Sequence, residues 1–359
     1  MIDLIVYDQE FNAQGIVDVQ SSVMWERRFY EAGYFEIHTP ATENNNALLQ
    51  QGNYIMRTDA YESGTIMYLH ASTAADGSTD IAAIGRFLSW LLHGHIVQNT
   101  TTYSGNAETV MRDLVQATVM NSETVDYIPN LELGELCRTE KTVSVRLEYP
   151  DLHDALKEIA RRSGVGFRLI LDPNDGKLYF ECFDSHDYSA EQSDNPRVIF
   201  SPDYDTIIGS ASYTVNDGAT VNCVTVVYSG AFGTTSIRYN PNNVSGTDMR
   251  ELCVVTDKCV TYSNEGGTYL NVAATQALLR SMAPDYISEK KTEVEASAAY
   301  TGSFVYKEDY DIGDIVTVEY KPYGITLTQR IHGICENYTE SGKDIIPIMG
   351  PIWPKGEEL

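Results

Sequence analysis

Apolar and polar residues alternate in short runs between residues 23 and 95. The runs at 34–38 (YFEIH) and 65–70 (TIMYLH) show this most clearly, and glycines separate the runs, at Gly33, Gly52, Gly64, Gly77 and Gly85. Because successive side chains of a strand point to opposite faces, the pattern predicts half-buried antiparallel strands joined by turns. Strands at this spacing, rich in Ile, Tyr and Phe, favour a small closed barrel or a sandwich.

The pattern changes to a helical period at three places. Apolar residues recur every three or four positions over residues 107–119, directly after the N-cap candidate Asn106. A second helix is predicted over residues 152–163, ending at Gly164. A third helix candidate covers residues 269–282.

Strand patterns surround these helices. Residues 166–171 and 177–183 predict a hairpin across the turn 172–176 (DPNDG), which with the second helix makes a compact α+β segment. The segment 128–140 has no clear pattern and is predicted to be a loop. Further strand patterns follow at residues 210–215, 221–228, 252–260 and 292–348. The predicted fold class is therefore α+β, mainly β.

The chain is strongly acidic. Its 359 residues include 51 Asp and Glu against 25 Lys and Arg, a formal net charge of −26. Such a charge repels nucleic acids and anionic membrane surfaces, and its simplest role is to keep the protein soluble. The length is sufficient for two or three domains with cores of their own.

The sequence contains no segment typical of secretion or of a membrane span. Residues 1–12 carry Asp3 and Asp8 where a signal peptide has basic residues, and the apolar runs are shorter than a membrane helix requires. No membrane insertion is therefore expected. The six cysteines include no C-x-x-C pair, which favours free, buried thiols and assembly in a reducing cytoplasm.

Residue types that could hold a metal occur in three places, one of which is the set Asp309, Asp311 and Asp314. His93 and His95 would lie on one face of a strand as a zinc pair, but no third ligand is near in sequence. The turn 172–176 resembles a calcium loop, but it lacks the glutamate that closes such a loop. We therefore expect neither a metal nor a cofactor. The common nucleophile, zinc-protease and phosphate-loop motifs are missing, so we expect no enzymatic activity.

A bulky cluster of aromatic and basic residues lies at residues 25–30. It consists of Trp25, Arg27, Arg28, Phe29 and Tyr30. Aromatic residues and arginine are enriched at the energetic centres of protein interfaces, so the cluster is a candidate subunit interface. The alternative is a core strand whose arginines pair with nearby acidic residues, and the sequence does not decide between the two.

Several short motifs, taken in order, resemble one known family. They are Trp25-Glu26-Arg27-Arg28, Gly33-Tyr34-Phe35-Glu36, Gly52-Asn53-Tyr54-Ile55, Ile84-Gly85-Arg86-Phe87-Leu88, Val198-Ile199-Phe200-Ser201, and the segment from Tyr306 through Asp309-Tyr310-Asp311-Ile312-Gly313-Asp314-Ile315-Val316. Their order and spacing resemble the tail hub proteins (tail-tip or baseplate-hub proteins) of siphophages, whose fold is related to the central hub of the T-even phage baseplate. The resemblance covers nearly the whole chain.

This resemblance implies an architecture of two tail-tube-like β-barrel domains with small α+β insertions. The corresponding segments are a first barrel-like domain at 1–105, a helix and linker at 106–140, an α+β insertion at 141–200, and a second barrel-like domain with an inserted helix and C-terminal strands at 201–359. Because the hub-like motifs reach close to the end of the sequence, we expect no appended catalytic domain.

The resemblance also implies a role at the tip of a virion tail. Three chains would form a homotrimeric ring that joins the sixfold tail tube to threefold tip components and lines the DNA channel. The implied partners are a tail tube or distal tail protein, spike or fibre proteins, and passing DNA that an acidic wall does not bind. Two alternatives remain, a carbohydrate-binding adhesin that uses the 24 tyrosines and a tail-associated cell-wall hydrolase that uses paired carboxylates.

Overall fold

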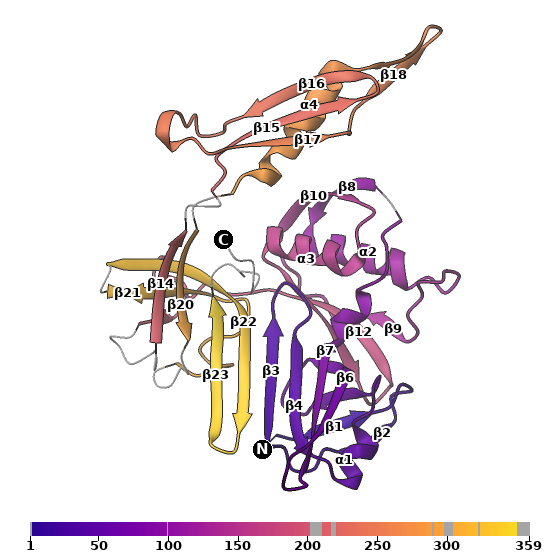
Figure 1. Cartoon of the computed structure of the whole chain (residues 1–359), viewed down its shortest axis with the longest axis vertical. Helices are drawn as coiled ribbons and strands as arrows, with labels where there is room; N and C mark the ends of the chain where they lie inside the picture. Colours follow the sequence, from indigo (N-terminus) through magenta and orange to yellow (C-terminus); the bar gives the residue numbers. More distant parts are fainter. Residues whose placement is uncertain are drawn as a thin grey trace. The chain divides into compact units, whose positions relative to one another are not determined.

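The structure is a computed structural model that describes residues 2–98, 100–201, 210–216, 220–288, 291–297, 304–321 and 324–349. The chain forms two compact units, and the second, Tyr213–Glu293, is inserted into the first. The chain passes between the units through β14 (Ser210–Asn216) and β20 (Lys291–Ser297), which pair with each other. Figure 1 follows the chain by colour from one end to the other.

An eleven-stranded sheet dominates the first unit, in the order β13-β21-β22-β3-β4-β7-β6-β5-β1-β2, with β23 also paired to β22. Its strands from the first third of the chain are β1 (Leu4–Tyr7), β2 (Ala13–Ile16), β3 (Ser22–Arg28), β4 (Tyr34–Pro40), β5 (Tyr54–Arg57), β6 (Ser63–Thr73) and β7 (Thr79–Phe87). A short helix, α1 (Glu43–Leu48), joins β4 to β5. The alternation read from the sequence therefore does mark antiparallel strands.

The remaining strands of this sheet come from much later in the chain. They are β13 (Ile199–Phe200), β21 (Ile315–Tyr320), β22 (Ile325–Thr339) and β23 (Gly342–Met349). The first part of β22 pairs with β21, and its last part lies between β3 and β23. The long yellow hairpin of β22 and β23 lies beside β3 in Figure 1. One strand thus joins the two ends of the sequence into one sheet.

An α+β segment follows β7 in the first unit. It contains two helices, α2 (Ala107–Val119) and α3 (Leu152–Ser163), the 3-10 turn η1 (Leu88–Leu92), the strand pair β8 (Thr100–Asn106) and β10 (Thr142–Glu148), and the three-stranded sheet β9 (Leu131–Leu133), β11 (Gly166–Asp172) and β12 (Lys177–Phe183). Asn106 and Asp151 cap the two helices, and Gly164 ends α3 with a positive φ of 69°. The two predicted helices and the hairpin are confirmed. The predicted loop at 128–140 is wrong at β9, a three-residue strand too short to leave an alternation.

The second unit contains a three-stranded sheet covered on one face by a helix. The sheet has the order β16-β15-β17, from β15 (Cys223–Gly230), β16 (Gly233–Tyr239) and β17 (Glu251–Thr256). The hairpin β18 (Thr261–Asn264) and β19 (Gly267–Leu270) leads into α4 (Val272–Met282), which packs on β15 and β16. Two 3-10 turns, η3 (Gly246–Asp248) and η4 (Ala283–Tyr286), complete the unit. The third predicted helix is confirmed, although it begins three residues later than predicted.

The α+β, mainly β class is confirmed. Within the described residues the large sheet is an open path, and no pairing closes it into a barrel. In the same residues, no helix has the length and apolar character needed to cross a membrane. All six cysteines are free, but Cys253 is exposed rather than buried because it lies on β17, at the outer edge of its sheet.

Two glycines, Gly85 in β7 and Gly33 just before β4, are required by close packing. An added Cβ at Gly85 would lie 2.0 Å from the Thr65 carbonyl oxygen and 2.4 Å from the Phe35 ring. At Gly33 it would lie 2.1 Å from the Glu26 carbonyl oxygen. The Phe35 ring itself stacks on Trp25, with centroids 5.6 Å apart. These glycines therefore let a fully buried aromatic layer lie directly against the backbone.

We expect Gly85→Ala to destabilise the first unit by about 3 kcal/mol, because neither a carbonyl group nor a packed ring can move away cheaply. Gly77→Ala is the matched control, since Gly77 has a φ of 89° and open space around it, and should cost only about 1 kcal/mol. Urea denaturation followed by tryptophan fluorescence measures both. Equal losses for the two variants would contradict this account of Gly85.

Candidate functional site

The predicted interface cluster is mostly buried within the single chain. Trp25 and Phe29 have no exposed surface, and the Arg27 side chain is 3% exposed. Arg28 and Tyr30 are partly buried, and Arg28 forms an ion pair with Glu26. This placement agrees with the alternative interpretation, a core strand whose arginines pair with acidic residues. A contact between this cluster and a neighbouring copy remains a prediction.

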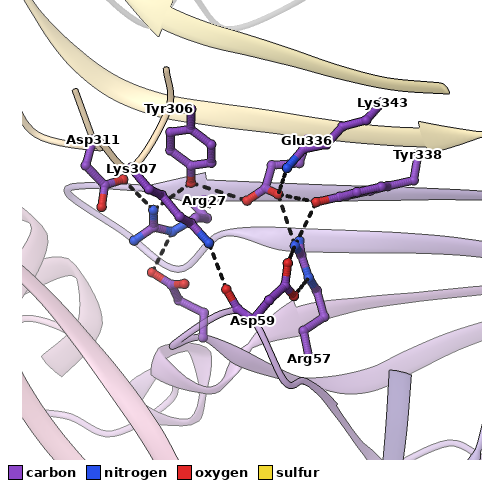
Figure 2. Close-up of polar contacts among 10 residues, drawn as sticks. Arg27, Arg57, Asp59, Tyr306, Lys307, Asp311, Glu336, Tyr338 and Lys343 are labelled. Atoms are coloured by element: carbon purple, nitrogen blue, oxygen red, sulfur yellow. Dashed lines mark hydrogen bonds and ion pairs between the residues drawn. The ribbon is translucent and has the colours of Figure 1, made fainter. Parts of the chain in front are cut away.

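Arg27 belongs to a buried network of charged groups and tyrosines. Its Nε donates to Glu62 Oε1 at 2.8 Å, and its Nη1 donates to Tyr306 Oη at 2.7 Å and to Asp311 Oδ1 at 2.6 Å. Figure 2 shows these contacts reaching from β3 to the segment before β21. A single guanidinium therefore ties together three segments that are distant in sequence.

Arg57, at the end of β5, forms the second centre of the network. It binds the Asp59 carboxylate with two nitrogens, Nε at 2.9 Å and Nη2 at 2.8 Å. The same Nη2 lies 3.0 Å from Glu336 Oε2 and donates to Tyr338 Oη at 2.8 Å. The guanidinium also lies over the Trp25 ring, 5.3 Å from its centroid. Its side chain has no exposed surface.

Strand register explains why these groups meet. Glu336 lies opposite Trp25, and Tyr338 lies opposite Val23, in the antiparallel pairing of β22 with β3. Both β22 side chains therefore point to the same face of the sheet as Trp25 and Val23. Glu336 also accepts from Tyr306 at 3.2 Å and from Tyr338 at 2.6 Å, and Lys343 Nζ lies 3.6 Å away (Figure 2).

The network holds Glu336 and Arg27 in their charged forms. Burial alone would raise the pKa of Glu336, but the Arg57 charge and the Tyr338 hydroxyl outweigh it, so this pKa lies below its ordinary value. Burial would also lower the pKa of Arg27, but Glu62, Tyr306 and Asp311 raise it well above normal. The pKa of Tyr306 is raised, mainly by burial. The tyrosines therefore act as neutral hydrogen-bond donors.

This arrangement is suited to holding segments together rather than to catalysis. The carboxylates of Glu62, Asp311 and Glu336 each bind an arginine, so none is free to act as an acid or a base. A hollow of about 280 Å³ opens beside Asp311, but its lining mixes both signs of charge, including Arg168, Lys307 and Asp314. That lining does not single out a class of ligand.

The metal candidates are already occupied by protein contacts. His93 pairs with Asp151 at 3.3 Å, whereas His95 pairs with Asp126 at 3.2 Å, so the two histidines do not share a ligand site. Asp151, His153 and Asp154 lie close enough to hold an ion. However, Asp151 accepts from the Gly94 backbone and caps α3, and His153 Nε2 accepts from the Ala32 backbone. The segment 172–176 is a hairpin turn between β11 and β12.

Sequence reasoning found only part of this network. Arg27 was singled out, and Tyr306 and Asp311 fall in a family motif, but Arg57, Asp59, Glu62, Glu336 and Tyr338 were missed. A signal was present, because Arg57 ends the run YIMR and Glu336 interrupts the run IHGICENY, both otherwise strand-like. A charged side chain on the inner face of a strand requires a partner, but the sequence does not show which residue that partner is.

The fold is shared with phage tail proteins over nearly the full length of the chain. A tail protein from Neisseria meningitidis superposes with a TM-score of 0.57 at 15% identity, covering 97% of this chain and 96% of that one. The 43 kDa tail protein of prophage MuSo2 from Shewanella oneidensis gives 0.54 at 13% identity, covering 97% and 98%. The prophage tail protein gp18 from Listeria monocytogenes gives 0.51 at 14% identity, covering 98% and 94%. The protein therefore has the fold of phage tail proteins.

The family follows from a match to the sequence itself. Residues 3–351 match the family of Siphovirus ReqiPepy6 Gp37-like proteins, and the chain belongs to this family. The resemblance to siphophage tail proteins is thereby confirmed. A chain in the Francisella PdpA–VgrG complex also has a similar fold, with a TM-score of 0.51 at 10% identity, covering all of this chain and 60% of that one. No curated protein matches the sequence.

We expect Arg57→Ala to destabilise the protein by about 3–5 kcal/mol, because it leaves the Glu336 carboxylate buried without its main countercharge. Arg146→Ala is the matched control, since Arg146 forms an exposed strand-surface pair with Glu148 and should cost at most about 1 kcal/mol. Urea denaturation compares the two variants. A loss below about 1 kcal/mol for Arg57→Ala would show that the network contributes little to stability.

The network should also make the stability of the folded protein depend on pH. The pKa of Glu336 and that of Asp59 are both lowered in the folded protein. The stability that these two carboxylates contribute is therefore fully present at pH values above the pKa of an unfolded carboxyl group, about 4. It is lost as the pH falls through their lower pKa values in the folded protein. We expect the stability difference between wild type and Glu336→Gln to be largest at pH 7 and to shrink below pH 4. Urea titrations at pH 7, 5 and 3 measure it, and a constant difference would exclude this linkage.

Proposed function

We propose that the protein is a structural hub at the tip of a siphovirus tail, without enzymatic activity. The observation that carries the proposal is the shared fold, which extends over more than nine tenths of both chains in three comparisons with phage tail proteins. Membership of a siphovirus family agrees with it. The buried network agrees too, because it stabilises a rigid scaffold and leaves its carboxylates paired.

In this proposal each chain contributes two barrel-like halves to a ring. The first half corresponds to β1–β7, and the second contains β13 and β21–β23 with β14 and β20. Strand β22 belongs to both halves, because its first part pairs with β21 and its last part with β3. Three chains then give six similar halves, which can join the sixfold tail tube to threefold tip components. The predicted segments 1–105, 106–140, 141–200 and 201–359 describe the order of these parts along the chain.

The proposed partners are the tail tube or distal tail protein on one side and spike or fibre proteins on the other. The similar fold in a complex that contains VgrG supports an association with further tail components. The charge supports a channel that DNA passes without binding, since the segments 1–212 and 294–350 together hold 41 Asp and Glu against 18 Lys and Arg. The protein would assemble in the host cytoplasm and remain at the virion tail tip.

One observation favours the adhesin as a second candidate function. Tyr262 and Tyr269 stack at 5.8 Å on the hairpin β18–β19, and both rings are about half exposed. Paired exposed aromatic rings can bind a sugar face or a protein surface. The cell-wall hydrolase has no comparable support, because the carboxylates that the structure brings together in the network are bound to arginines.

We expect the purified chain to form trimers, because a ring hub requires threefold self-association. Mass photometry over a range of concentrations measures this directly. We also expect no clearing of a peptidoglycan suspension by the same sample and no shift on a glycan array. A monomer at all concentrations would count against the hub, and glycan binding lost in Tyr262→Ala would favour the adhesin.

A further inference from the structure

His153 is a buried histidine in the first turn of α3. Only 2% of its surface is exposed, although its imidazole ring is polar and can be protonated. The ring meets two aromatic rings edge to face, Trp90 with centroids 5.3 Å apart and Phe167 with centroids 5.8 Å apart. The 3-10 turn η1 and strand β11 supply these rings. His153 is therefore packed among aromatic groups and away from water.

One hydrogen bond fixes the protonation state of this ring. His153 Nε2 accepts from the backbone N–H of Ala32 at 3.1 Å. An imidazole nitrogen can accept only when it carries no proton, so the ring is neutral and its single proton is on Nδ1. Ala32 is itself only 1% exposed, so water reaches this amide only when the local packing opens.

This bond joins two parts of the first unit. Ala32 lies in the turn between β3 and β4, whereas His153 belongs to the α+β segment. A second contact holds the same turn to α3, the ion pair of Glu31 with Lys157. The turn also carries part of the candidate interface cluster. The charge state of His153 therefore affects how α3 is attached to a turn of the large sheet.

Several charged groups surround His153. They are Asp151, Asp154 and Lys157 on α3, Glu31 in the turn between β3 and β4, His93 after η1, and Arg86 of β7, which lies over the Trp90 ring. Burial lowers the pKa of His153, and Asp154, Glu31 and Asp151 partly offset this effect. Asp154 Oδ1 lies 3.9 Å from His153 Nδ1, beyond the distance of a hydrogen bond. The carboxylates thus bring protonation within the mildly acidic range without forming a direct bond to the ring.

We propose that His153 is a pH-sensitive switch that loosens the contact between α3 and the turn between β3 and β4 in mild acid. Protonation places a hydrogen on Nε2, so two donors, Nε2 and the Ala32 N–H, then face each other and the bond is lost. The positive charge also lies in the first turn of α3, where the helix dipole disfavours it. This inference goes beyond the proposed hub function and does not depend on it.

The direction of the pH dependence follows from the lowered pKa. A histidine in an unfolded or opened segment takes up its proton near pH 6.5, and the folded protein takes it up only at a lower pH. The contact is therefore fully present above about pH 6.5 and is lost as the pH falls through the lower pKa of folded His153. Burial alone would raise the pKa of Glu31, but Lys157 outweighs it, so this pKa lies below its ordinary value and the ion pair persists at pH 5. The change therefore stays local to the bond at Ala32.

Hydrogen exchange of the turn tests the switch. His153→Gln is the central variant, because the glutamine Oε1 can accept from Ala32 at the position of Nε2 but takes up no proton in this range. Mass spectrometry of the full chain compares the peptide that contains Ala32 in wild type and His153→Gln at pH 7 and at pH 5. Comparison at the same pH cancels the intrinsic effect of pH on exchange. We expect equal rates at pH 7 and at least fivefold faster exchange in the wild type at pH 5. A rate ratio that is the same at both pH values would overturn the proposal.

His93→Gln is the matched control. His93 stacks on Trp90 with centroids 4.2 Å apart and is 45% exposed, so it is the neighbouring histidine that could produce a similar response. We expect His93→Gln to keep the response of the wild type, and loss of the response in this variant would assign the switch to His93 instead. Peptides from β1 and β2 should exchange equally in wild type and His153→Gln at pH 5. Equal acceleration of all peptides in the wild type would mean general acid unfolding and would also overturn a local switch.

The wild type alone provides a second measurement, which does not depend on the folding of a variant. After correction for the intrinsic rate at each pH, the protection of the Ala32 peptide should fall at least fivefold relative to that of the hairpin β6–β7 between pH 7 and pH 5. That hairpin is the reference because its paired strands lie outside the contact with His153. An unchanged relative protection would exclude the switch.

Discussion

The pairing of Arg57 with Glu336 sets the shape of the large sheet. Four strands separate β5 from β22 along the sheet, and in a flat sheet that separation would be about 24 Å. The observed distance between Arg57 Nη2 and Glu336 Oε2 is 3.0 Å, so the sheet must curl until these strands face each other. Two buried charges can be tolerated only in this geometry, because either one alone would cost several kcal/mol. The apolar layer around Trp25 and Phe35 is enclosed by the same curl.

The motifs that contain glycine allow the close packing that this curled sheet requires. Gly33 and Gly85 come from motifs that resemble the tail hub family, and the structure gives them a physical reason. Each lies where the backbone of a neighbouring strand and an aromatic ring leave no space for a Cβ atom. A family pattern of this kind therefore records how closely strands and rings approach, and this is why it identifies the fold although each motif is short.

Local features of the fold could be predicted from the sequence, and long-range ones could not. The caps at Asn106 and Asp151 and the period of α2 and α3 are local signals, and they predict those helices closely. The pairing of β22 with β3 joins residues about 300 positions apart, and the sequence of neither strand identifies the other as its partner. The network was missed for the same reason. Arg27 is visible as a charge among aromatic residues, but its partners Glu62, Tyr306 and Asp311 become partners only after the sheet has curled.

Charge and exposed apolar surface are divided unequally between the two units. The first unit buries Arg27 and Arg57 in ion pairs and leaves an excess of acidic residues, which favours solubility. The second unit has little net charge, and its edge strand β17 exposes Leu252 and Val255 and pairs on one side only among the described residues. The division of charge therefore separates the solubilising surface, which the first unit supplies, from the apolar edge of the second unit.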